Sequence, residues 1–321
     1  MTDLDWLDEY AALTQAAGWT DQTDWTVLEV RGRDRTRLLH TLATNQLDDQ
    51  PPGHGRETFF TDAKGHIVAH AIVLVGDDTT ALVTTAAASP SLAAHIRRYI
   101  LREDVQLSAR AADHRLIYLG GPNAESTLKN LGIHPPSECF HHGSFSVSGH
   151  EVSVCRVEIA GPTGFLLDAP RAMAVRLEEA GARPCRRQAL TAARIESGWP
   201  LDRIDITSDN LPQEVGRNAA AISFTKGCYL GQETIARIES RGHVNRHLVG
   251  IRFEVTSTAQ ATDLTHDSRS VGQTTSSTYS PILGSSLALA YVRREFSAPG
   301  TKLHSPTGPA QVVELPLRAP Q

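Results

Sequence analysis

The chain has 321 residues, 40% of them hydrophobic and 21% charged, which is typical of a globular protein with two or three cores. Its net charge of −5 argues against a dedicated nucleic-acid-binding protein, so direct nucleic-acid binding is not favoured. No stretch is long and apolar enough to cross a bilayer, and residues 1–10 are acidic, so we expect a cytoplasmic protein. Four cysteines without CxxC pairing predict reduced thiols and no stably bound metal.

The first third of the chain alternates strand and helix patterns. The run at 25–30 predicts a strand. The next element is expected to be a helix that begins at Asp34, with Leu38, Leu39 and Leu42 on its apolar face. Turn signals and apolar periodicity predict the next elements, which are strands at 57–61, 67–75, 81–85, 105–107 and 116–119 and a helix from Ser89. The mixture indicates an α+β fold with antiparallel sheets.

The middle of the chain repeats this style without a detectable sequence period, which suggests two related α+β lobes. From about Arg246 the pattern changes to short strands, which predicts a small all-β domain. We therefore expect one α+β region over 1–243 and a second domain over 244–321. The elements on which this rests are helices at 123–131 and 171–180, and strands at 145–147, 152–159, 165–168, 247–254, 270–274, 287–293 and 311–315.

The segment TKGCYLGQE, at 225–233, has the composition of a binding loop. Gly227 and Gly231 permit positive φ, and a helix is expected over 232–239. Cys228 would lie near the amide end of that helix, where the helix dipole and the ammonium of Lys226 both favour thiolate over thiol. The alternative is that Cys228 is a small buried apolar residue.

Four segments carry a family resemblance: AISFTKGCYLGQE at 221–233, DRTRLLHTLATN at 34–45, RIESGWP at 194–200 and SPILGSSLALAYVRREF at 280–296. Together they resemble the YgfZ-type folate-binding proteins, relatives of the glycine-cleavage T-protein (GcvT). The resemblance implies a GcvT-like folate-binding region of ferredoxin-like lobes around a central cavity, followed by a carboxy-terminal β-barrel domain. It also implies tetrahydrofolate, or a derivative, as the cofactor.

Roles for several matched residues follow from folate chemistry. One carboxylate can accept hydrogen bonds from the pterin 2-amino group and N3 together, so Glu196 is the candidate pterin anchor; the alternative is a solvent-facing helix glutamate. The anionic glutamyl tail needs cations, for which Arg237, with Arg241 and Arg246, is a candidate, unless these charges form a solvated face. Asn45 would either bind the ligand or cap the preceding helix.

The loop supplies the remaining candidates. Tyr229, Gln232 and Glu233 are assigned to folate binding, although the last two would also suit a helix start. Cys228 and Lys226 are the candidate catalytic residues. One thiolate cannot hold an iron-sulfur cluster alone, since such clusters usually use four cysteines, but it could bridge transiently to a partner or act as a redox nucleophile.

One strand departs from the enzymatic relatives. The T-protein pattern resembles GGVIDD, whose second aspartate is the catalytic group, whereas this chain reads GHIVAH and ends at His70. Aminomethyl transfer needs an anion beside the folate nitrogen, and an imidazole cannot provide one. A neutral imidazole could still act as a base near pH 7. The replacement argues against aminomethyltransferase activity.

Three hypotheses follow. The leading one is a folate-binding accessory protein that, like its YgfZ-type relatives, supports assembly or repair of iron-sulfur enzymes, including tRNA-modifying enzymes, through Cys228. Its partners would be folate and iron-sulfur proteins or their assembly factors. The second is a folate-dependent aminomethyl or methyl transferase. The third is a non-catalytic interaction module that does not bind folate.

Overall fold

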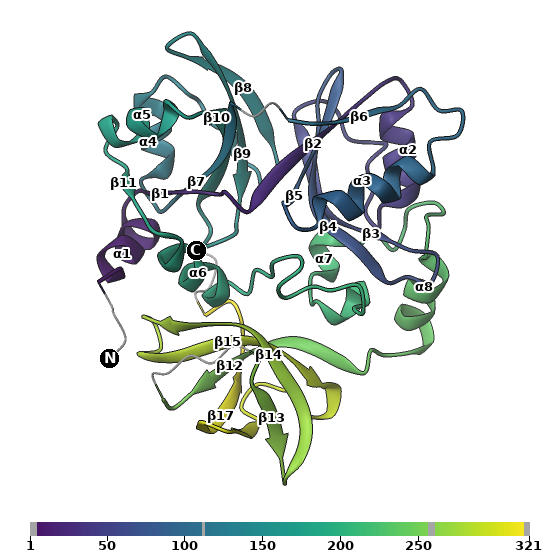
Figure 1. Ribbon diagram of the computed structural model, residues 1–321, viewed down its shortest axis with the longest axis vertical. Helices are drawn as coiled ribbons and strands as arrows, with labels where there is room; N and C mark the ends of the chain where they lie inside the picture. The colour runs from purple at the N-terminus through teal and green to yellow at the C-terminus, as the bar shows by residue number, and fades with distance from the viewer. Residues whose placement is uncertain (1–4, 111–112, 256–260, 318–321) are drawn as a thin grey trace.

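The computed structural model describes residues 5–110, 113–255 and 261–317. Two α+β lobes lie side by side above a β-barrel, and α6 (Arg187–Glu196) lies where the three meet (Figure 1). This is the GcvT-like α+β architecture with a carboxy-terminal barrel that the resemblance implied.

The first lobe is a five-stranded sheet in the order β3-β4-β5-β2-β6. Helices α2 and α3 share one hydrophobic core with this sheet, because their buried residues, such as Leu39 and Leu92, contact the side chains of β2, β4 and β5. The elements are β2 (Trp25–Arg31), α2 (Arg35–Leu42), β3 (His54–Thr61), β4 (Ile67–Val75), β5 (Thr79–Thr85), α3 (Ser89–Arg98) and β6 (Gln106–Ala109). All seven were predicted; β4 has the predicted bounds, and the ends of most of the others are shifted.

The second lobe is a six-stranded sheet in the order β11-β1-β7-β10-β9-β8, with α4 and α5 in its own core. Its elements are α1 (Leu7–Gln15), β1 (Gly18–Asp21), β7 (His114–Gly120), α4 (Ala124–Asn130), β8 (His142–Val147), β9 (His150–Val157), β10 (Gly164–Pro170), α5 (Met173–Glu179) and β11 (Arg183–Pro184). The sequence did not predict α1, β1 or β11. The amino-terminal segment thus completes the sheet of the second lobe, although the first lobe follows it in the chain.

The two sheets pack face to face through a shared core. Ile72 and Val83 of the first lobe meet Tyr118 and Leu166 of the second, and the core continues into α1 and α6. One face of each sheet is therefore buried against the other lobe, and a functional residue on these faces must lie between the lobes.

The carboxy-terminal domain is a closed six-stranded barrel in the order β12-β15-β14-β13-β16-β17. Ile195 of α6 packs on Leu287 and Leu289, which fixes the barrel to the lobes. The strands are β12 (Arg246–Phe253), β13 (Asp263–His266), β14 (Arg269–Ser280), β15 (Ser285–Arg293), β16 (Lys302–Ser305) and β17 (Gly308–Val313). The connection from α6 contains two short helices, α7 (Asn218–Ala221) and α8 (Gln232–Arg241). Within the described residues, none of the helices has the length and apolar content that crossing a membrane requires.

Candidate functional site

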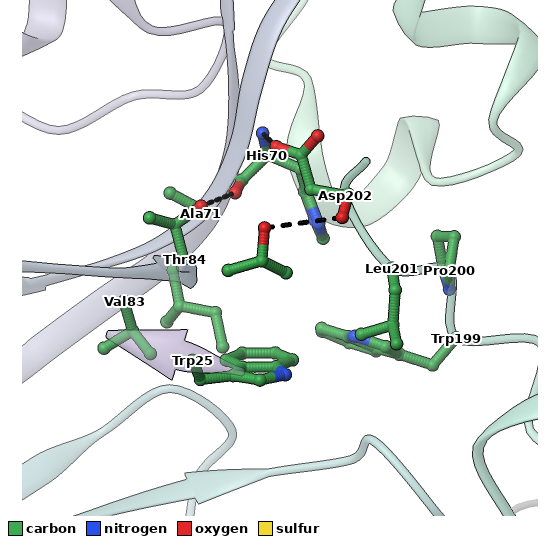
Figure 2. Close-up of a pocket in the computed structure, with 11 residues that line it drawn as sticks. Trp25, His70, Ala71, Val83, Thr84, Trp199, Pro200, Leu201 and Asp202 are labelled. Atoms are coloured by element: carbon green, nitrogen blue, oxygen red, sulfur yellow. Dashed lines mark hydrogen bonds between the residues drawn. The ribbon is translucent and has the colours of Figure 1, made fainter. Parts of the chain in front are cut away.

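The candidate site lies around His70 on β4, where the connection after α6 crosses the two lobes. This connection brings Trp199, Asp202 and Arg217 to the strand. Asp202 Oδ2 accepts a hydrogen bond of 2.7 Å from the His70 backbone N–H. Figure 2 shows Trp25 and Trp199 on one side of the pocket, with His70 and Asp202 on the other.

The register of β3 and β4 places a carboxylate beside the His70 imidazole. Phe59 pairs with His70, and paired residues of antiparallel strands share a face, so Glu57 is the diagonal neighbour of His70 on that face. Its Oε1 lies 2.8 Å from His70 Nε2. Because an ionised carboxylate only accepts hydrogen bonds, Nε2 donates the proton in this contact, and in the neutral form of the ring Nδ1 would carry the lone pair.

Glu57 also forms a paired hydrogen bond with a buried arginine. Arg217 donates from Nε to Oε1 at 2.9 Å and from Nη2 to Oε2 at 2.5 Å. Burial would raise the pKa of Glu57, but the hydrogen bonds and charge of Arg217, with those of His70, lower it to about 2. Glu57 is therefore an anion at neutral pH, and the Arg217 guanidinium lies 4.5 Å from the ring centre of Trp199.

The pocket at His70 is small but has larger neighbours. Its volume of ≈ 10 Å³ holds about one water molecule. A cavity of ≈ 300 Å³ adjoins it and shares Trp25, Leu201 and Asp202 as lining residues. A second cavity, of ≈ 340 Å³, adjoins it through Trp199 and is lined by Cys139, among others. Two ligand-sized cavities therefore adjoin the pocket at His70, and each shares a tryptophan with it.

Lys226 points into the protein, toward the end of α2. Its Nζ donates to the backbone oxygens of His40, Ala43 and Asn45 at 2.6, 2.8 and 2.9 Å. Burial lowers the pKa of Lys226 to about 8, against a smaller opposite effect of Asp48. The ammonium thus neutralises the carboxy-terminal end of α2, and its influence on the Cys228 thiolate remains a prediction.

Asn45 and Tyr229 lie in the same buried region. Asn45 Nδ2 donates to the backbone oxygens of Glu57 and Ala220, while its Oδ1 accepts from the Gln46 amide. Tyr229 packs in a core with Phe59, and burial raises its pKa to about 12. Both side chains thus support the β3 strand around Glu57. Their contact with a ligand remains a prediction.

Cys228 is exposed, so the alternative of a buried apolar residue is wrong. The other three thiols differ, because burial raises the pKa of Cys139 and of Cys185 to about 12 and that of Cys155 well above its usual value. Among the described residues, no group of three or more His, Cys, Asp or Glu side chains is arranged to hold a metal ion.

The predicted helix after Cys228 is confirmed as α8, and Gly231 precedes it with a φ of 81°. A β-carbon at Gly231 would lie 2.4 Å from the Asp62 backbone oxygen and 2.9 Å from Gly65 Cα, so the loop touches the β3–β4 turn closely. Thr61 Oγ1 also donates to the Leu230 oxygen at 2.6 Å. Gly227 does not adopt a positive φ.

The polar candidates on α8 lie at its surface, on the opposite side of the molecule from α1 (Figure 1). Gln232 is half-buried at the first helical position, and Glu233 and Arg237 are exposed. Of the other tail candidates, Arg246 is paired with Glu214 at 3.1 Å. Folate contacts by these residues remain predictions.

Glu196 is buried, with 3% of its surface exposed, so the solvent-facing alternative is wrong. Its Oε2 accepts from the Tyr10 hydroxyl, and its Oε1 accepts from Ser280 Oγ at 2.5 Å and from the Ile282 amide at 3.2 Å. The side chain thus joins α1 and α6 to the barrel. Its role as pterin anchor remains a prediction.

Sequence reasoning missed Glu57, Arg217 and Asp202. Glu57 lies in the strand expected at 57–61, but fixing the turn at 62–66 pairs Thr61 with Ile67 and would put Phe59 opposite Ala69. The observed pairing of Phe59 with His70 depends on a register shift between Phe60 and Thr61, which the sequence pattern does not show. Arg217 reaches Glu57 across 160 residues of sequence, and no local pattern marks such a contact.

Comparisons with known proteins agree with this architecture. The GCVT N-terminal domain matches residues 3–226, and the glycine cleavage T-protein C-terminal barrel domain matches residues 246–317. The chain is 28% identical over 304 residues to the aminomethyltransferase of Thermosynechococcus vestitus, covering 92% of this chain and 82% of that protein. It is also 28% identical over 318 residues to the aminomethyltransferase of Rubrobacter xylanophilus, covering 96% and 85%. The fold is similar to the solved structure of glycine cleavage system aminomethyltransferase T from Bartonella henselae, with a TM-score of 0.86 at 20% identity over 97% of this chain and 89% of that one. The chain therefore belongs to the glycine cleavage T-protein family.

Proposed function

We propose that the protein binds tetrahydrofolate, or a derivative, and transfers a one-carbon unit to or from it, with His70 as the base. The family supports this reading, because the curated relatives are named aminomethyltransferases. It reverses the expectation drawn from the sequence, in which the replacement of the T-protein aspartate by His70 argued against transfer.

The observation that carries the proposal is the 2.8 Å contact between His70 Nε2 and Glu57. It supplies the anion that the sequence lacked, because a carboxylate held by Arg217 stands directly behind the imidazole. His70 Nδ1 would accept the proton that the folate nitrogen loses as it attacks the donor carbon and the bond from that carbon to its carrier breaks, and it would pass this proton to the departing group. Glu57 would then stabilise the imidazolium that forms, as a carboxylate does behind a catalytic histidine.

The test is formation of methylene-tetrahydrofolate from a glycine-derived aminomethyl donor. We expect turnover by the wild type and a loss of about 100-fold or more in His70→Asn, which keeps a polar side chain but removes the base. Binding of tetrahydrofolate to the variant, measured by calorimetry, should persist. His150→Asn is the matched control, because His150 is exposed on β9. Absence of turnover by the wild type contradicts the proposal.

A second candidate, the YgfZ-type accessory function, is favoured by the exposure of Cys228. Here the protein would support assembly or repair of iron-sulfur enzymes, including tRNA-modifying ones, through this thiol while it binds folate. A deletion strain with low iron-sulfur enzyme activity tests this second candidate. The accessory function predicts that Cys228→Ser fails to restore that activity and that His70→Asn restores it, with Cys185→Ser as the thiol control. If tetrahydrofolate does not stabilise the protein, both give way to the non-catalytic interaction module.

A further inference from the structure

A third ligand-sized cavity, of ≈ 340 Å³, lies between the sheets of the two lobes. It shares Val83 with the pocket at His70, but among the described residues it shares no lining residue with the two cavities beside that pocket. Strands β2 and β5 of the first lobe and β8, β9 and β10 of the second contribute to its walls, and these strands lie above α6 in Figure 1. The cavity is therefore a candidate binding site that the proposed folate chemistry does not use.

The floor of this cavity is apolar and comes from both lobes. Val27, Leu74 and Val83 of the first lobe and Leu116 and Leu166 of the second line it, and all five are buried in the core that the lobes share. Aliphatic carbon atoms gain free energy when they cover such a surface. A ligand with an aliphatic chain would therefore contact both lobes at once.

The charged groups around this floor are mostly acidic. The lining contains five carboxylates and two guanidinium groups, and burial lowers the pKa of its one histidine, His142, so that ring is neutral at pH 7. The cavity therefore has an excess of negative charge and favours a cationic ligand. The carboxylates are those of Glu29, Asp77, Asp78, Glu151 and Asp168, and the guanidinium groups are those of Arg31 and Arg110.

Both arginines of the cavity are paired with its two least exposed carboxylates. Arg110 donates from Nη1 to Glu29 Oε1 at 2.6 Å, and its Nε lies 2.9 Å from Asp168 Oδ2. Arg31 donates to the other oxygen of Glu29 at 3.1 Å, and His114 lies 3.0 Å from Asp168 Oδ1. Glu29 and Asp168 thus have their cations already, and the excess negative charge belongs to the other three carboxylates.

These three carboxylates stand on opposite sides of the cavity. Asp77 and Asp78 form the turn between β4 and β5 in the first lobe, and Glu151 lies near the start of β9 in the second. All three are exposed, and none of them forms a salt bridge with any part of the chain that the structure describes. The cavity thus has an anionic lip on each lobe, with an apolar floor between the two lips.

We propose that this cavity binds an aliphatic polyamine, with its methylene chain over the apolar floor and its ammonium groups on the carboxylates of the two lips. An ammonium group has only donors, which suits carboxylates that lack a cation. A bare metal ion fits less well, because it would leave the apolar floor uncovered, and the described residues contain no group of three or more His, Cys, Asp or Glu side chains arranged to hold one. The polyamine would stabilise the packing of the lobes, since it contacts both. This inference does not depend on folate binding.

The test is calorimetric titration of spermidine into the full chain at constant ionic strength. Glu151→Gln removes the charge of one lip, and the double variant Asp77→Asn with Asp78→Asn removes that of the other; Arg35 donates to the Asp77 backbone oxygen, which asparagine keeps. We expect each change to weaken spermidine binding by about fivefold. Glu178→Gln is the matched control, because it removes one exposed carboxylate on α5 and should leave the affinity unchanged.

Two further measurements separate the cavity from general surface charge. Ser144→Tyr fills the cavity without changing the net charge and should abolish spermidine binding. Butylamine, which has a single ammonium group, should bind the wild type more weakly than spermidine does. Glu151→Gln should reduce that difference, because the second ammonium group then loses its partner.

Three results would overturn the inference. These are the absence of binding heat from the wild type at millimolar spermidine, equal weakening in Glu178→Gln and Glu151→Gln, and unchanged affinity in Ser144→Tyr. The last two would mean that spermidine is attracted to an acidic surface in general. Tetrahydrofolate binding by the same variants is a separate measurement, so failure of the proposed function is distinguishable from failure of this inference.

Discussion

The buried Glu57 carboxylate gives the sharpest stability prediction. Glu57→Gln keeps the shape of the side chain but removes the charge and turns an amide N–H₂ toward the donors of Arg217. The fall of the Glu57 pKa from 4.5 to about 2 corresponds to about 3 kcal/mol of folding free energy at pH 7. Removing one partner of a buried ion pair costs a similar amount. We therefore expect the variant to lose about 3 kcal/mol in urea unfolding followed by tryptophan fluorescence.

The same measurement at several pH values checks the cause. Because the folded pKa of Glu57 lies below the unfolded value, its contribution is complete above 4.5 and is lost as pH falls toward 2. The difference between wild type and variant should shrink across this window. Glu239→Gln, on the exposed face of α8, should change the free energy of unfolding by less than about 0.5 kcal/mol. A loss below about 1 kcal/mol for Glu57→Gln, or a difference independent of pH, would refute the reasoning.

Three further predictions concern the loop around Cys228. Gly231→Ala should destabilise the protein by more than about 1 kcal/mol, because its φ is positive and a β-carbon would meet backbone 2.4 Å away; Gly227→Ala, with open space around it, should be neutral in the same urea titration. Lys226→Met leaves three buried carbonyl oxygens without their donor and should cost about 3 kcal/mol, and a shift in unfolding midpoint worth under about 1 kcal/mol would contradict this. A thiol reagent should label Cys228 in the native protein but Cys155 only after unfolding; mass spectrometry that finds Cys155 modified first would count against the assigned burial.

Most of the fold could be predicted because its elements carry local periodicity. The strands of the first lobe and the barrel alternate or form apolar runs, and turn residues separate them. Helix α1 was missed in an acidic segment, although Trp6, Tyr10 and Leu13 have helical spacing and are all buried. Much of the buried face of α6 is alanine, which gives little hydrophobic contrast.

The site was less predictable because its contacts are long-range. The loop TKGCYLGQE was recognised from composition, but the partners of Lys226 lie more than 180 residues earlier in the chain. Polarity alone suggested that Lys226 acts on the neighbouring thiol, whereas burial and unpaired helix carbonyl groups determine where its ammonium points. Similarly, the carboxylate judged absent at His70 is supplied by the adjacent strand, and only the strand register reveals it.

The close contact between Gly231 and Gly65 has a mechanical consequence. The turn that contains Gly65 leads directly into β4, so the Cys228 loop and the strand that carries His70 are fastened together. Tightly packed backbone transmits displacement instead of absorbing it. A spin label on Cys228 should therefore report, through a change in its mobility, whether filling the pocket moves that strand.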